Sequence, residues 1–184
     1  SGNVGVGVLL RGGRNNIIGA NIIGLNASGQ LDLGNTSHGI EIDRSGGFVI
    51  DGSFASFSIS GNGGDGIFIH DTIHGTRSRI GGIPPGPGQI ESVFIGTDAN
   101  GTRALGNDGA GIRILGSTRI NLGDTNFLSG LLPGTSVISG NHADGIMISG
   151  SSYVSVGRVN VGTNVTGSLA VPNGGDGIRL VGSS

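Results

Sequence analysis

The acidic and histidine side chains that could take part in chemistry gather between residues 38 and 74. Asp43 and the dipeptide His70-Asp71 stand out, because carboxylate and imidazole groups perform general acid–base catalysis and bind divalent metals. Their spacing matches no defined metal-ligand motif, and a solvated outer face is the favoured alternative. The full set is His38, Glu41, Asp43, His70, Asp71 and His74.

Calcium is the one cofactor that the sequence leaves open. Residues 61–68 read Gly-Asn-Gly-Gly-Asp-Gly-Ile-Phe, which is similar to one unit of the glycine-rich nonapeptide calcium roll. That roll needs tandem nonapeptides, whereas this unit comes only once per longer repeat. We therefore predict no cofactor. We interpret Asp65, Asp144 and Asp176, which each precede a repeat glycine, as residues that cap turns.

An eight-residue pattern recurs six times and must position these side chains. It consists of Asn, three residues, Gly, an aliphatic residue, any residue and a second aliphatic residue, at spacings of 32, 27, 45, 34 and 32. The in-out-in alternation predicts a strand with one buried face. The asparagines are Asn3, Asn35, Asn62, Asn107, Asn141 and Asn173, and the glycines are Gly7, Gly39, Gly66, Gly111, Gly145 and Gly177.

A unit of this size cannot bury its apolar face alone, so it must stack on its neighbours. In a stack, equivalent residues lie about 4.8 Å apart, and the six asparagines form a ladder of amide hydrogen bonds. Asparagine also tolerates left-handed backbone, which a sharp corner needs. Glycine fits where there is no room for a Cβ. We predict that both columns are structural and do not bind a ligand.

Each full repeat contains three short apolar runs, which in the first repeat are residues 7–10, 16–19 and 21–24. This predicts an all-β fold, a single-stranded parallel β-helix with three short strands per coil and about five to six coils. We expect one solenoid over residues 1–184. The other runs are 39–42, 48–50, 57–60, 66–69, 78–81, 92–96, 111–114, 119–123, 136–139, 145–148, 153–157 and 158–162.

The connections after the third run alternate between a long and a short form. The long forms, at residues 23–29, 95–101 and 161–167, hold Asn or Asp with Gly three residues later, which is typical of a turn. The short forms are residues 59–62 and 138–141. The alternation predicts that the true structural period is two coils.

Composition excludes several classes of function. Only 12% of residues are charged and the net charge is −2, which argues against nucleic acid as a partner. Cysteine is absent, so there are no disulfides or thiolate metal sites. No apolar span is long enough for membrane insertion. The 41 glycines indicate many tight turns.

Residues 95–107, 111–114, 137–141 and 144–146 resemble the repeats of large bacterial surface and secreted proteins. Those are right-handed parallel β-helix repeat proteins, often with CSLREA-type domains, that share the pectate-lyase-like fold. The resemblance covers nearly the whole chain and implies a right-handed helix. It also implies an extracellular, non-catalytic, stalk-like or adhesin-like segment, although a fold alone does not determine function.

Two insertions, at residues 83–90 and 125–134, interrupt neighbouring coils at the same corner. Insertions in solenoids map to one surface, which is often the binding face. We expect an apolar bump that contacts a partner; the alternative is that the loops cover each other or a gap in the wall. Its candidate contact residues are Phe127, Leu128, Leu131 and Leu132.

The sequence thus favours a structural or assembly module outside the cell or at its surface, and not an enzyme. Neither end of the chain shows a cap, and uncapped coils offer unpaired backbone groups to further strands. The expected partner is therefore a second copy, as in a filament built end to end, or flanking repeats of the same chain. The rival function is a polysaccharide-binding or polysaccharide-cleaving protein that holds a glycan at Asp43, His70 and Asp71.

Overall fold

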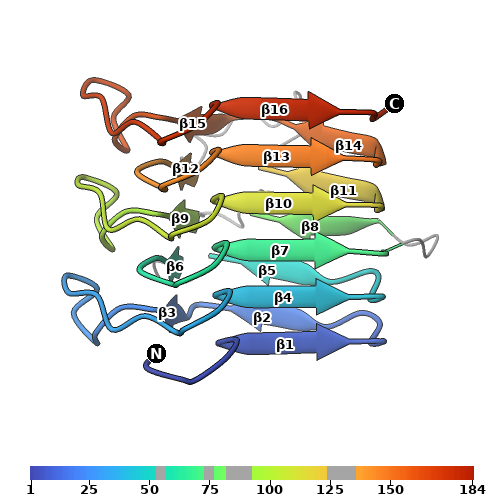
Figure 1. Ribbon diagram of the computed structural model, residues 1–184, viewed down its shortest axis with the longest axis horizontal. Helices are drawn as coiled ribbons and strands as arrows, with labels where there is room; N and C mark the ends of the chain where they lie inside the picture. Colours follow the sequence, from blue (N-terminus) through green and yellow to red (C-terminus); the bar gives the residue numbers. More distant parts are fainter. Residues whose placement is uncertain (53–56, 73–76, 82–92, 124–135) are drawn as a thin grey trace, which may run out of the picture.

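The computed structural model describes residues 1–52, 57–72, 77–81, 93–123 and 136–184. Within these ranges every regular element is a β-strand. No helix in them is long and apolar enough to cross a membrane. The strands wind around the molecule in successive coils, which stack from the N-terminus to the C-terminus (Figure 1).

Three parallel sheets form the walls of the coils. The first sheet contains β1 (Val8–Arg11), β4 (Ile40–Asp43), β7 (Ile67–His70), β10 (Ile112–Leu115), β13 (Ile146–Ser149) and β16 (Ile178–Val181). The second sheet contains β2 (Ile17–Gly19), β5 (Val49–Asp51), β8 (Ser78–Ile80), β11 (Thr118–Leu122) and β14 (Ser152–Val156). The third sheet contains β3 (Ile22–Ile23), β6 (Phe57–Ile59), β9 (Val93–Ile95), β12 (Ser136–Ile138) and β15 (Val159–Val161).

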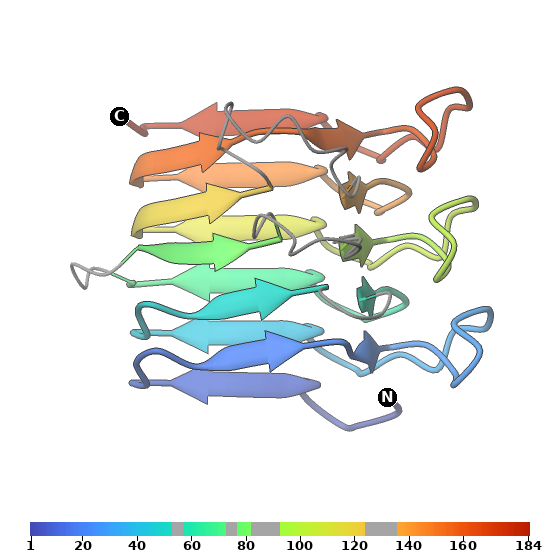
Figure 2. The ribbon, with the colours of Figure 1, turned by 180° about the vertical axis from the view of Figure 1, so that it is seen from behind.

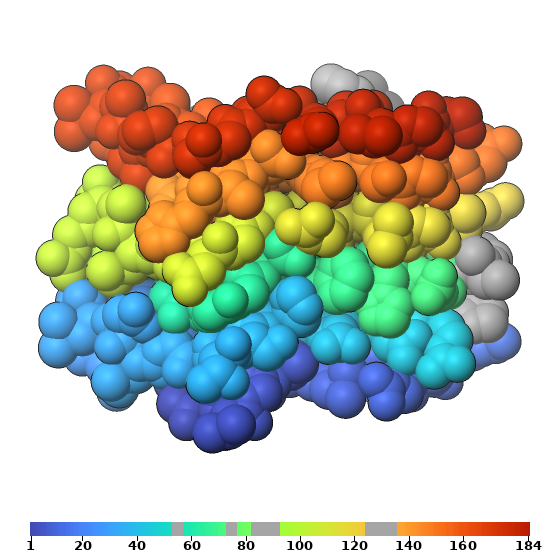
Figure 3. All heavy atoms as spheres, viewed as in Figure 1, coloured from blue at the N-terminus to red at the C-terminus, as the bar shows by residue number. Residues whose placement is uncertain are grey.

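The chain is a right-handed parallel β-helix, which confirms the predicted fold. Strands of the first sheet pair residue for residue, so that Ile40 lies opposite Ile67 and Ile67 opposite Ile112. The repeat spacing varies from 27 to 45 residues, yet this register is kept. The connections between strands therefore absorb the differences in length, and Figure 3 shows the coils as successive bands of colour.

The predicted strand boundaries in the first sheet were wrong by one residue at each end. The strand expected over residues 39–42 is Ile40–Asp43, and the one expected over 66–69 is Ile67–His70. The repeat glycine lies outside the strand, and the strand instead includes the residue that follows the second aliphatic residue. Asp43 and His70 therefore belong to rigid neighbouring strands and not to turns.

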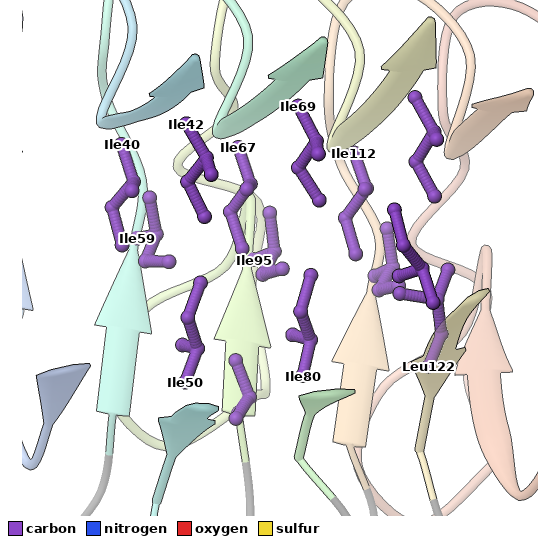
Figure 4. Packing of buried hydrophobic residues seen from close by; sticks show 14 of the residues in the cluster. Ile40, Ile42, Ile50, Ile59, Ile67, Ile69, Ile80, Ile95, Ile112 and Leu122 are labelled. Carbon is purple, nitrogen blue, oxygen red and sulfur yellow. The ribbon is translucent and has the colours of Figure 1, made fainter. Parts of the chain in front are cut away.

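The aliphatic pairs point inward and form the core of the helix (Figure 4). Ile40, Ile42, Ile67 and Ile69 are fully buried, and each contributes about 1.5–3 kcal/mol to stability. In the last coil the equivalent Leu180 is 66% exposed. Burial of the aliphatic face therefore depends on a neighbouring coil on each side.

The corner after each strand of the first sheet uses left-handed backbone. Four of its six positions are glycine, and Arg44 and Asp71 hold the same conformation in the second and third coils. The ladder asparagines do not have this conformation, contrary to the sequence prediction. The left-handed residues of this corner are Gly12, Arg44, Asp71, Gly116, Gly150 and Gly182.

The long connections form three arms that project from the stack beside β3, β9 and β15 (Figure 1). Each arm is closed by an antiparallel bridge, as between Thr97 and Ala104. The arms touch one another across the intervening coil, because Ala99 donates its backbone N–H to the carbonyl oxygen of Gly29 at 3.0 Å. This confirms the predicted two-coil period.

Candidate functional site

The six ladder asparagines form an unbroken chain of side-chain hydrogen bonds. The Nδ2 of each of the first five donates to the Oδ1 of the asparagine in the next coil, at distances from 2.7 to 3.0 Å. The backbone N–H of each of these five asparagines donates to the same oxygen. Asn107 is fully buried. Every inner amide is thus both donor and acceptor, which suits a structural column and leaves no free group for a ligand.

The glycine column gives the ladder the space it needs. A Cβ at Gly111 would lie 2.8 Å from the Nδ2 of Asn141 and 2.7 Å from the carbonyl oxygen of Gly145. It would also lie 2.5 Å from Cγ2 of Ile138. Real Cβ atoms do not approach heavy atoms so closely, so an alanine here would push the asparagine and the core apart.

A second ladder, of hydroxyl groups, lies at the opposite end of the first sheet, and the sequence analysis missed it. The Oγ of Ser117 accepts the backbone N–H of Thr72 at 3.1 Å, and the Oγ of Ser151 accepts that of Ser117 at 3.1 Å. The sequence does contain a pattern for this ladder, because the residue ten positions after each ladder asparagine is Ser or Thr in five of six copies. The column is Gly13, Ser45, Thr72, Ser117, Ser151 and Ser183.

The candidate ligand face is assembled as predicted, because Asp43 and His70 are register partners in β4 and β7. The Nδ1 of His70 lies 3.8 Å from the Oδ1 of Asp43 and 3.1 Å from the Oδ2 of Asp71. Its Nε2 lies 3.5 Å from the Oε1 of Glu41. The imidazole ring also stacks on Phe68, with 4.7 Å between the ring centroids.

Two arginines that the sequence analysis did not assign hold Asp43. Arg11 donates its Nε to Oδ2 at 2.7 Å, and Arg44 donates its Nε to Oδ1 at 2.8 Å. The hydrogen bond from Arg44 is the main cause that lowers the pKa of Asp43; burial opposes it and Arg11 reinforces it. Asp43 is only 4% exposed, so it is not the solvated surface group that the alternative interpretation expected.

The donor atoms of Asp43, His70 and Asp71 lie within 4.8 Å of one another, which is close enough for one metal ion. The arrangement fits a metal poorly, however. Both oxygens of Asp43 already accept hydrogen bonds from guanidinium groups, and the charges of Arg11 and Arg44 repel a cation. The cluster is a network in which the imidazole of His70 lies within 4.0 Å of the carboxylates of Glu41, Asp43 and Asp71.

The aspartate of the calcium-roll-like stretch is occupied by protein groups. The Oδ1 of Asp65 accepts the backbone N–H of Ala110 at 2.7 Å, and its Oδ2 accepts the Nε of Arg113 at 2.8 Å. The hydrogen bond that Arg113 donates to Asp65 is the main cause that raises the pKa of Arg113. Asp144 likewise accepts the N–H of Asp176 from the next coil. These carboxylates join neighbouring coils, whereas the sequence predicted that each would cap its own turn.

The expected apolar bump lies outside the described residues. Phe127, Leu128, Leu131 and Leu132 all belong to residues 124–135, and the other insertion falls within 82–92. His74 also lies outside the described ranges. The contact site that these residues suggested stays a prediction from the sequence.

No protein-family model, curated protein or solved structure matches the chain.

Proposed function

We propose that this chain is a structural module, a stiff spacer built from stacked coils in an extracellular or cell-surface protein. The observation that carries the proposal is the continuity of the asparagine ladder from Asn3 to Asn173. In-register parallel strands and a side-chain ladder resist bending together, because any bend must stretch a row of hydrogen bonds. The resemblance to bacterial surface repeat proteins supports the extracellular setting.

The terminal coils support lengthening by further coils. Ile178 and Leu180 are 45% and 66% exposed, whereas the equivalent side chains of the inner coils are buried. The described stack is itself not elongated, since its longest axis is horizontal in Figure 1 and runs along the strands. The first sheet has six strands, one for each coil, and a rod requires more coils than these.

The further coils have two possible sources, a second copy of the chain stacked end to end or flanking repeats of the same chain. The exposed strand β16 fits either source, because its unpaired edge can accept another parallel strand.

A lengthened chain tests the modular rod directly. We would insert a second copy of residues 3–61, which are two coils, in front of residue 62, so that long and short connections still alternate. The stack should lengthen by about 10 Å in small-angle X-ray scattering, with no loss of melting temperature. Light scattering and electron microscopy on the same sample separate monomers from filaments. A chain that melts lower without lengthening contradicts the proposal.

The rival function, a polysaccharide-binding or polysaccharide-cleaving protein, rests on the imidazole of His70 among three carboxylates. It predicts binding or turnover on a panel of glycans, lost on changing His70 and Asp71 to Ala. The spacer proposal predicts that these two changes affect no such activity. The engagement of Asp43 by Arg11 and Arg44 supports the structural interpretation of this cluster.

A further inference from the structure

A second polar face lies on the outer surface of the second sheet, away from the His70 cluster. Figure 2 shows its strands β8, β11 and β14 in front, in green, yellow and orange. A groove of about 280 Å³ crosses them. It is lined by Arg77, Arg119, Asn121, Tyr153 and Ser155.

The strand register places these residues in two columns. Ile120 pairs with Ser78 on one side and with Val154 on the other. The residues one position earlier, Arg77, Arg119 and Tyr153, therefore form one column across three coils. Two residues further along the strands, Asn121 lies opposite Ser155 in β14. The groove thus presents two guanidinium groups, one aromatic ring, one amide and one hydroxyl group.

The positive charge of the groove is not neutralised by the described residues. Four arginines of the described residues pair with carboxylates, and they are Arg11, Arg44, Arg103 and Arg113. Arg77 and Arg119, in contrast, have no carboxylate within 4.0 Å among the residues that the structure describes. In the described strands of this sheet the only acid is Asp51, in β5 outside the groove.

Arg119 and Tyr153 occupy positions that the backbone disfavours for them. Both have left-handed backbone, with φ of 59° and 54°. The same corner position in the first two coils holds Asn15 and Gly47, which are residue types that adopt this conformation readily. A long or bulky side chain there costs stability, and such cost is typical of functional positions.

The two strained side chains also act together. The guanidinium carbon of Arg119 lies 6.0 Å from the centroid of the Tyr153 ring, a cation–π contact. Tyr153 is nevertheless 76% exposed, so a ligand can reach its side chain. A sugar ring can pack on an aromatic ring, while a guanidinium group can bind an oxyanion with two parallel hydrogen bonds.

We propose that this groove binds an anionic saccharide. Arg77 and Arg119 would hold its carboxylate or sulfate group, and Tyr153 would support the sugar ring. Ser155 supplies a hydroxyl group for hydrogen bonds with the hydroxyls of the saccharide. A nucleic acid is the less fitting polyanion, because the net charge of the chain is −2 and the groove has a single aromatic ring. The site does not rest on the proposed spacer function, and a further coil stacked beyond β14 would border it at Tyr153.

The test measures binding of short oligosaccharides by titration calorimetry. The probes are a sulfated heparin hexasaccharide and an oligogalacturonate, with maltohexaose as the neutral comparison and inorganic sulfate as the free ion. The variants are Arg119→Gly and Tyr153→Gly, because glycine suits a left-handed position and should preserve the fold. Arg103→Ala is the control, since it removes the same charge from an arm, where Arg103 pairs with Asp98.

We expect at least one anionic oligosaccharide to bind and maltohexaose not to bind. Each glycine variant should weaken that binding by about tenfold or more, with an unchanged or raised melting temperature, and Arg103→Ala should not. If neither anionic oligosaccharide binds, the proposal is overturned. Equal affinity for inorganic sulfate, or a stronger Arg119-dependent affinity for single-stranded DNA, also overturns it. Melting temperatures that fall in both glycine variants without any change in binding assign the pair a structural role.

Discussion

Asn107 donates its side-chain amide to the Oδ1 of Asn141 at 2.9 Å, and its backbone N–H points to the same oxygen at 3.4 Å. One amide oxygen therefore holds both the side chain and the main chain of the previous coil. The same geometry recurs at every step of the ladder. The asparagine at this position of the repeat therefore determines how neighbouring coils stack.

Replacing Asn107 with alanine should destabilise the protein. The change removes the acceptor of the Asn62 side-chain amide and backbone N–H, at 2.8 and 3.1 Å, in a fully buried place. We expect a loss of about 1–3 kcal/mol for each buried group left unpaired, measured by urea denaturation. Asn3→Ala is the matched control, because Asn3 is the exposed end of the ladder. Equal losses in the two variants would contradict the ladder as a source of stability.

Alanine in the glycine column should be harmful inside the stack and tolerated at its end. At Gly111 the new Cβ would meet Ile138, Gly145 and Asn141 within 2.8 Å, and we expect a loss of about 1–3 kcal/mol or more. Gly177 is the equivalent position of the last coil. A Cβ added there would have Cγ1 of Val161 as its nearest atom, at 3.6 Å. Thermal melting of Gly111→Ala and Gly177→Ala compares the two. A similar melting temperature for both variants would sink the steric argument.

The hydroxyl ladder predicts that Ser117→Ala lowers stability by about 1–3 kcal/mol. The change leaves the N–H of Thr72 without its acceptor, and both residues are fully buried. Ser28→Ala serves as control, because Ser28 is exposed on an arm and bonds only to Asn26 in the same arm. Chemical denaturation of both variants measures the difference. If Ser117→Ala is as stable as the unmodified chain, the hydroxyl column does not contribute.

The ion pairs of Asp43 should make part of the stability depend on pH. Arg44 and Arg11 lower the pKa of Asp43 in the folded state. A lowered folded pKa means that the contribution is complete above the unfolded pKa of about 3.9. It is lost as the pH falls through the folded pKa, when the carboxylate takes up a proton. The melting temperature of Asp43→Asn should therefore lie below that of the unmodified chain at pH 6, and the gap should begin to shrink below about pH 4. A gap that is constant from pH 6 to pH 3 would show that the charge of Asp43 does not stabilise the fold.

Much of the fold could be predicted from the sequence because its signals repeat. The Asn-x-x-x-Gly pattern with its two aliphatic residues occurs six times, and each copy reports the same local environment. Parallel stacking then places equal residues over one another, so the asparagine ladder and the partnership of Asp43 with His70 follow from counting along the chain. The long and short connections gave the two-coil period for the same reason.

Only the tertiary structure revealed the contacts between residues that do not recur from coil to coil. The clamping of Asp43 by Arg11 and Arg44, and the groove of Arg77, Arg119 and Tyr153, occur once each. They depend on the direction of outward side chains and on which backbone positions are left-handed. Because the connections differ in length, the sequence does not show which outward side chains of neighbouring coils lie next to each other. The repeated pattern fixes the core and the ladders through burial, whereas the outer faces are set by the way individual coils meet.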